Sequence, residues 1–228
     1  MSYWRATQLE RSVLLGLLLL AAVIEISQVD LLLGDWLYQL EGGAWSLRSN
    51  FWTQTVLHDG AKILIQAVML LVLIAVLGQR LRLGRQPIRG IEVALIAIVI
   101  SVVITAIVKT VSNVSCPWGL LRYGGDHPYV SIFRAGHGLD LGACFPAGHA
   151  SAGYSLFAFY FLARINDRRS GFFWLVIALS IGLVLDVVQQ LRGAHFLSHG
   201  LWTVIIVWAV NLGVFAVFYP SNAQIDVR

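Results

Sequence analysis

Apolar residues are gathered into six blocks along the chain, and shorter polar stretches separate these blocks. A helix needs about 20 mostly apolar residues to cross a bilayer, and the blocks reach or approach that length with their flanking residues. The pattern predicts an all-α membrane helical bundle in which residues 1–228 form a single integral membrane domain. The six predicted transmembrane helices are residues 13–26, 61–78, 91–108, 149–163, 172–188 and 201–218.

The first block lies near the N-terminus, where a signal peptide would lie, but the residues after it do not form a cleavage site. A signal peptide ends at small residues that form a cleavage site. Here the chain continues instead through Glu25, Gln28 and Asp30. We therefore expect this block to remain in the protein as a membrane anchor.

Two of the connections between blocks are long. Residues 27–60 mix tryptophan, tyrosine and leucine with polar residues, which is typical of a segment that lies on the membrane surface. Residues 109–148 are rich in glycine and contain both cysteines. Because loops of that length are usually functional or disordered, and this one joins two predicted helices, we expect it to be functional.

The charged residues predict how the bundle is oriented. Only 12% of the chain is charged against 58% hydrophobic, which excludes an ordinary soluble enzyme and a disordered chain. Ten of the 16 lysines and arginines fall on the side of the N-terminus, four of them within residues 79–90. The positive-inside rule then places both termini in the cytoplasm and residues 27–60 and 109–148 on the outer side of a bacterial-type inner membrane. Topology explains the basic residues, so we expect no nucleic-acid partner despite the net charge of +4.

Cys116 and Cys144 lie near opposite ends of the loop of residues 109–148, on the predicted oxidising side. An even number of cysteines in that compartment favours a disulfide between them. Such a bond closes a loop of 27 intervening residues and contributes about 2–4 kcal/mol to stability. Two free buried thiols are the alternative.

Candidate chemistry is concentrated at predicted helix ends on the outer side. Lys109 ends the third helix, Gly148 and His149 open the fourth, and Arg192 and His195 lie between the fifth and sixth. A helix N-terminus offers free backbone N–H groups that suit a phosphate, and lysine and arginine stabilise its developing negative charge. One histidine can attack phosphorus while another protonates the leaving oxygen. This set needs no metal and no cofactor.

These stretches resemble the three motifs of the type 2 phosphatidic acid phosphatase superfamily of membrane phosphatases. The resemblance covers residues 61–218, and its motif residues are Lys109 and Pro117 in the first motif, Pro146, Gly148 and His149 in the second, and His195 in the third. It implies an outward-facing active-site loop and a nucleophile, His195, that forms a phosphohistidine. It also implies that His149 is the general acid and later the base. Lys109 and Arg192, with the backbone at Ala147 and Gly148, then bind the phosphate.

Four positions depart from the family pattern, namely Cys116 for arginine, Ala147 for serine, Gln189 for arginine and His199 for aspartate. Arg192 lies three residues after Gln189, so a helical turn would aim it at the same phosphate. Arg122 is a second candidate to replace a missing cation. His199 is four residues after His195 and is the candidate to hold that imidazole in place.

Asp186 lies within the fifth predicted helix, where an ionisable side chain is costly and therefore a functional hypothesis by default. We expect it to pair with Lys109 or Arg192, or to orient a histidine. A structural partner buried between helices is the alternative. The run from Gly193 to His199 most resembles the branch of the superfamily that includes lipid A phosphatases.

The sequence therefore predicts a metal-independent lipid phosphatase that hydrolyses a phosphate monoester or diphosphate of a membrane lipid at the outer face. Its partners are that lipid and the bilayer. Three alternatives stay open at this point. The four departures are compatible with an inactive protein that binds lipid phosphate or assists transport, a lipid phosphotransferase would carry the same residues, and helix-end histidines are also typical of haem or metal sites.

Overall fold

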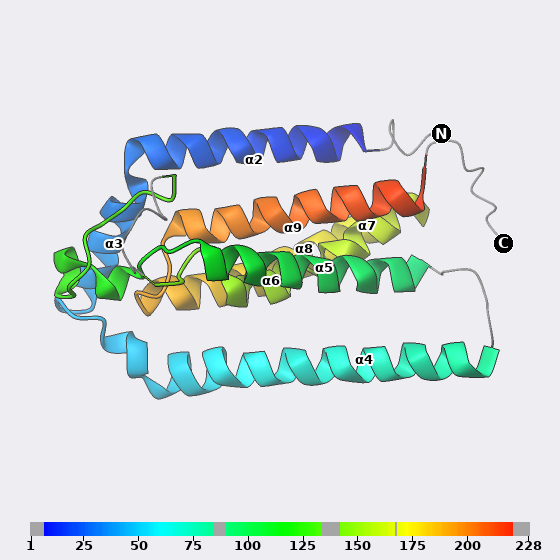
Figure 1. Ribbon diagram of the computed structural model, residues 1–228, viewed down its shortest axis with the longest axis horizontal. Helices are drawn as coiled ribbons and strands as arrows, with labels where there is room; N and C mark the ends of the chain where they lie inside the picture. Colours follow the sequence, from blue (N-terminus) through cyan, green and yellow to red (C-terminus); the bar gives the residue numbers. More distant parts are fainter. Residues whose placement is uncertain (1–6, 84–89, 134–141, 167, 221–228) are drawn as a thin grey trace.

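The computed structural model describes residues 7–83, 90–133, 142–166 and 168–220. Within these residues the chain is helical and forms no strand, which confirms the predicted all-α class. The α-helices are α2 (Gln8–Ser27), α3 (Val29–Leu40), α4 (Ala61–Leu83), α5 (Gly90–Val111), α6 (Gly148–Tyr154), α7 (Phe157–Asn166), α8 (Arg168–Leu191) and α9 (Leu197–Phe218), drawn in Figure 1. The short elements are the 3-10 turns η1 (Ser46–Ser49), η3 (Pro117–Gly119) and η4 (Leu121–Tyr123), and the π-helix η2 (Phe51–Gly60).

Several helices are long and apolar enough to cross a membrane, which indicates a membrane protein. The α2–α3 pair adds a fifth candidate if its two parts are one span, bent by 67° where Gln28 has a positive φ of 56°. Part of the arginine-rich connection, residues 84–89, lies outside the described residues. The four unbroken candidates are Phe51–Arg82, Gly90–Val111, Ser170–Leu191 and Leu197–Phe218.

The predicted span of residues 149–163 consists of two short helices. Helix α6 ends at Tyr154 and α7 begins at Phe157, so neither approaches the length of about 20 residues that crosses a bilayer alone. Tyr154 and Phe157 are fully buried between the neighbouring helices. The count of six spans therefore remains a prediction.

Small residues let the central helices approach closely. A Cβ atom added to Gly153 of α6 would lie 2.5 Å from the backbone nitrogen of Gly182 in α8, so the two helix backbones are in contact. Ala97, Ala150 and Ala178 are fully buried in the same core. Close packing through small side chains is typical of membrane helices. This close packing brings the start of α6 beside α8. Arg192 and His195 follow directly after the end of α8.

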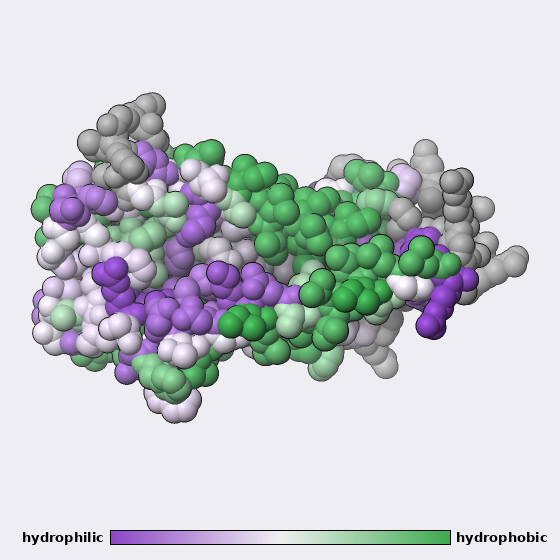
Figure 2. Space-filling view, turned by 60° about the horizontal axis from the view of Figure 1, so that its bottom comes forward, coloured by the Kyte–Doolittle hydropathy of each residue, from purple (hydrophilic) through white to green (hydrophobic). Residues whose placement is uncertain are grey.

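Helix α4 stands apart from the other helices (Figure 1). None of the residues in its apolar window is buried by the protein, and most of its described leucines and isoleucines are exposed. Arg80 of α4 forms an ion pair with Glu92 of α5 at the end of the bundle opposite α3. The face drawn in Figure 2 carries a broad apolar zone toward the middle of the long axis, with polar atoms gathered toward the α3 end. Exposed apolar side chains in such a zone suit contact with lipid.

The N-terminal part of the chain folds over the α3 end of the bundle. Asp30 of α3 accepts a hydrogen bond of 2.9 Å from the backbone nitrogen of Ser198, and so caps the start of α9. Trp45 packs against Gly193, where an added Cβ atom would lie 2.4 Å from the indole ring. Gly193 also has a positive φ of 66°, so both backbone conformation and space require glycine there. Residues 45–60, here called the cap segment, thereby lie against the α8–α9 connection.

Candidate active site

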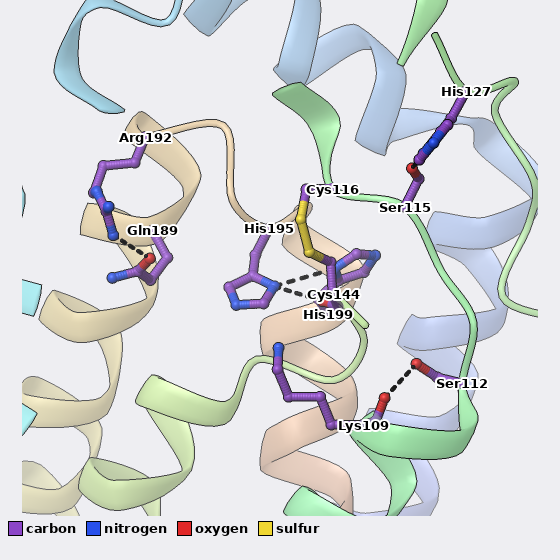
Figure 3. Close-up of a disulfide and its surroundings, with 10 residues drawn as sticks. All are labelled: Lys109, Ser112, Ser115, Cys116, His127, Cys144, Gln189, Arg192, His195 and His199. Atoms are coloured by element: carbon purple, nitrogen blue, oxygen red, sulfur yellow. Dashed lines mark hydrogen bonds between the residues drawn. A yellow bond between two sulfur atoms is a disulfide. The ribbon is translucent and has the colours of Figure 1, made fainter. Parts of the chain in front are cut away.

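The described structure brings most of the predicted site residues to one end of the bundle. Lys109 lies in the last turn of α5, His149 in the first turn of α6, and His199 in the first turn of α9. Arg192 and His195 lie in the connection between α8 and α9. Figure 3 shows the Lys109 amine pointing toward the His195 ring, with His199 beside that ring.

A disulfide joins Cys116 and Cys144 across the loop, with their Cα atoms 5.1 Å apart. The backbone nitrogen of Cys144 donates a 2.9 Å hydrogen bond to the carbonyl of Val114, so the two ends of the loop lie side by side. Trp118 is tied to Gly193 by a further backbone bond of 2.9 Å. Residues 134–141 of this loop lie outside the described residues. The disulfide thus holds Cys144 against the α8–α9 connection.

His195 is buried, and its Nδ1 atom lies 2.6 Å from the carbonyl oxygen of Cys144. A carbonyl oxygen only accepts hydrogen bonds, so Nδ1 carries the proton and the neutral ring keeps its lone pair on Nε2. Burial lowers the pKa of His195 well below its ordinary value, and the positive charge of Lys109 lowers it further. His195 is therefore neutral at pH 7, which is the state a nucleophile requires.

His199 is buried in an aromatic environment. Its ring makes edge contacts with Phe145 and Phe196, at centroid distances of 5.5 and 5.6 Å. Its Nδ1 atom lies 3.4 Å from Nδ1 of His195, a longer contact than the one from His195 to Cys144. The imidazole of His199 therefore lies beside that of His195, while the backbone carbonyl makes the closer contact.

The turn that precedes α6 is held in place by hydrogen bonds to residues of α9. The backbone nitrogen of Ala147 donates to the Thr203 hydroxyl at 2.9 Å and to the His199 carbonyl at 3.3 Å. Gly148 follows, and a Cβ atom there would lie 3.5 Å from Cδ of Lys109. The aliphatic part of Lys109 therefore runs along the start of α6. The N–H group of Ala147 is already engaged, which leaves the predicted backbone contact with phosphate to the residues that follow it.

Arg192 is buried, and its guanidinium is held by three acceptors. It donates to the side-chain oxygen of Gln189 at 2.8 Å, to the side-chain oxygen of Gln54, and twice to the carbonyl of Arg48 at 3.1 and 3.2 Å. Four of its five N–H groups are thus engaged within the protein. Gln189, which stands at the arginine position of the family motif, serves here to orient Arg192.

Sequence reasoning missed the contribution of the cap segment. The His58 ring stacks on the His149 ring with centroids 3.9 Å apart and an interplanar angle of 35°. Nδ1 of His58 lies 2.7 Å from a carboxylate oxygen of Asp59, and Gln54 donates to the other oxygen at 2.8 Å. The signal in the sequence was an adjacent histidine and aspartate just before a predicted span on the outer side.

Two predicted site residues lie outside this group. Arg122 forms a two-pronged ion pair with Asp35 of α3, and both side chains are partly exposed. Asp186 is buried in α8, where it accepts a 3.2 Å hydrogen bond from Gln190. A Cβ atom on Gly200 would lie 1.8 Å from the Asp186 carboxylate, so this side chain packs directly on the α9 backbone.

Among the residues that the structure describes, no group of three or more histidine, cysteine, aspartate or glutamate side chains is arranged to hold a metal ion. The predicted site residues brought together here, Lys109, His149, Arg192 and His195, instead offer an amine, a guanidinium and imidazoles. Such a set is suited to an anionic ligand.

Comparison with known proteins gives one match. A family model described as the PAP2 superfamily matches residues 92–223, which is more than half of the chain. The matched residues include the ends of α5, α6, α8 and α9 that form the site, whereas the cap segment precedes them. No curated protein and no solved structure matches the chain.

Proposed function

Because the chain belongs to the PAP2 superfamily, whose members have phosphatase-type activity, we propose that it is a metal-independent lipid phosphatase acting through a phosphohistidine. Its substrate is a phosphate monoester or diphosphate of a membrane lipid. The observation that carries the proposal is the meeting of Lys109, His149 and His195 at one end of the bundle.

The first chemical step is attack of His195 on phosphorus. Nε2 of His195 forms a bond to phosphorus while the bond from phosphorus to the lipid oxygen breaks. His149 gives its proton to that leaving oxygen, so the lipid departs as a neutral alcohol or as a lipid monophosphate. The amine of Lys109 and the guanidinium of Arg192 stabilise the negative charge that develops on the phosphoryl oxygens.

The second step is hydrolysis of the phosphohistidine. His149, now neutral, takes a proton from a water molecule as that water attacks phosphorus. The bond from phosphorus to Nε2 breaks and inorganic phosphate leaves. His195 returns to its neutral form with the Nδ1 proton still directed at the Cys144 carbonyl. His149 is protonated again and ready for the next substrate.

The proposed location follows from charge and from the position of the site. The site lies at one end of the apolar helices, where a lipid headgroup would meet it. The excess of arginine on the opposite side supports cytoplasmic termini and an outward-facing site in an inner membrane. The disulfide between Cys116 and Cys144 supports an oxidising compartment on the same side.

A second candidate function is an inactive protein that binds lipid phosphate. It is favoured by Arg192, whose guanidinium is largely engaged by Gln189, Gln54 and the Arg48 carbonyl. Because Arg192 has fewer free N–H donors for the phosphate, it would stabilise the transition state of phosphoryl transfer less. A lipid phosphotransferase differs from the hydrolase only in the acceptor that takes the phosphoryl group in the second step.

Phosphate release by the purified full chain in detergent with EDTA tests the proposal. Lipid A, undecaprenyl diphosphate and phosphatidate are offered separately, with His195→Ala as the control. We expect release from at least one lipid, loss of it in His195→Ala, and a reduction of roughly 10²–10⁴-fold in His149→Ala. Full activity in either variant would contradict the assigned roles. Tight lipid binding without release would favour the second candidate.

A further inference from the structure

The cap segment supplies an imidazole directly against the proposed general acid. His58 comes from η2 and His149 from the first turn of α6, and their rings are only 3.9 Å apart. The Nε2 atom of His149 is buried and makes no hydrogen bond to any described residue. No described hydrogen bond holds that atom, whereas the stacked His58 ring limits how the His149 ring can turn.

His58 is itself held in place. Its Nδ1 atom contacts the Asp59 carboxylate at 2.7 Å, and Asp59 is fixed by Gln54 at 2.8 Å. Gln54 then accepts a hydrogen bond from Arg192. One chain of contacts thus runs from the phosphate-binding arginine through Gln54 and Asp59 to the His58 ring. The His58 side chain is 21% exposed and that of Asp59 is 46% exposed, so the chain ends near solvent.

We propose that His58 is a positioning residue for His149, whose ring it holds in place by stacking. This inference rests on the proposed function, in which His149 gives and then takes a proton. His58 lies before the part of the chain that matches the family model, so the family motifs do not include it.

Two substitutions test the stacking. His58→Phe keeps an aromatic ring on His149, and His58→Ala removes it. Thr55→Ala is the matched control, because Thr55 is exposed on the same short helix. We expect His58→Ala to lower kcat about tenfold or more through misplacement of His149, with little change in KM. His58→Phe should keep most of the kcat of Thr55→Ala, because a stacked ring remains.

The environment of the His149 ring is followed by nuclear magnetic resonance of the full chain labelled at histidine ring carbons, with His149→Gln used to assign the signal. This readout does not depend on turnover. An unchanged His149 ring signal in His58→Ala, or a kcat in His58→Ala equal to that of Thr55→Ala, would overturn the inference. If the wild-type protein releases no phosphate, the proposed function fails, whereas the resonance of His149 still decides whether its ring stacks on His58.

Discussion

Nδ1 of His195 lies 2.6 Å from the carbonyl oxygen of Cys144, one of the two cysteines whose disulfide closes the loop between α5 and α6. The family pattern places an aspartate four residues after the nucleophilic histidine, and this chain has His199 there. In the described structure the backbone carbonyl makes the shortest contact with Nδ1. It selects the tautomer that leaves Nε2 free, which is the task that a carboxylate performs in comparable histidine sites.

Removal of the disulfide should therefore affect both stability and activity. The double substitution Cys116→Ser and Cys144→Ser releases a long loop, so we expect a loss of about 2–4 kcal/mol in the free energy of unfolding. Activity should fall as well, because the Cys144 carbonyl is no longer held against His195. Denaturation and phosphate release by the same preparation measure the two effects. A destabilised variant with unchanged kcat at a temperature where it is fully folded would show that the carbonyl has no role in catalysis.

A carboxylate in place of His199 should compensate for the loss of that carbonyl contact. In the variant without the disulfide, His199→Asp places an acceptor beside Nδ1 of His195. We expect kcat to recover by about tenfold, since one hydrogen bond to a charged group contributes about 1.5–3 kcal/mol. His199→Asn provides the uncharged control. Equal activity of the two substitutions would argue against an orienting role for the carboxylate.

The pH dependence of kcat/KM should reflect the lowered pKa of the buried His195. An imidazole attacks only when neutral, and burial lowers the pKa of His195 well below its ordinary value of 6.5. Activity should thus persist as the pH falls below 6.5 and be lost only at the lower pH where the ring gains a proton. Lys109→Gln removes a positive charge near His195, so its acid limb should move to higher pH. A wild-type acid limb at or above pH 6.5 would contradict the inferred environment of the ring.

Arg192 and Arg122 should differ strongly when each is replaced by alanine. Arg192 is buried among the site residues, and we expect Arg192→Ala to lower kcat/KM by roughly 10²-fold or more. Arg122 is paired with Asp35 at a partly exposed position, so Arg122→Ala should change the free energy of unfolding by about 0–1 kcal/mol and kcat/KM by less than about threefold. Parallel measurements of kcat/KM for the two variants test this expected difference. A large loss of kcat/KM in Arg122→Ala would instead indicate that Arg122 binds the phosphate.

The helical class and the meeting of Lys109, His149 and His195 at one end of the bundle follow from simple features of the sequence. Apolar blocks give the helices, and alternate crossings bring every second connection to the same side of a membrane. Residues at the ends of such helices are then neighbours even when they are far apart along the chain. This argument places a residue at an end of the bundle, but it does not say which side chains touch.

The breaks in the helices and the contacts between site residues could not be predicted. They depend on tertiary packing that no local sequence pattern specifies. The break between Tyr154 and Phe157 lies inside an apolar block, and the bend at Gln28 has no glycine or proline to signal it. The stacking of His58 on His149 joins residues from distant parts of the sequence. Its geometry is determined by how the cap segment packs against Gly193 and Arg192, which hydropathy and motif spacing do not specify.

Trapping of the phosphohistidine tests the central claim most directly. Purified protein is mixed with a lipid substrate carrying a radioactive phosphoryl group, the reaction is stopped within milliseconds by alkali, and the labelled peptide is identified by mass spectrometry. We predict label on His195 that is stable in base, lost in acid, and absent from His195→Gln. Phosphate release without label on His195, or label on another residue, would contradict the account.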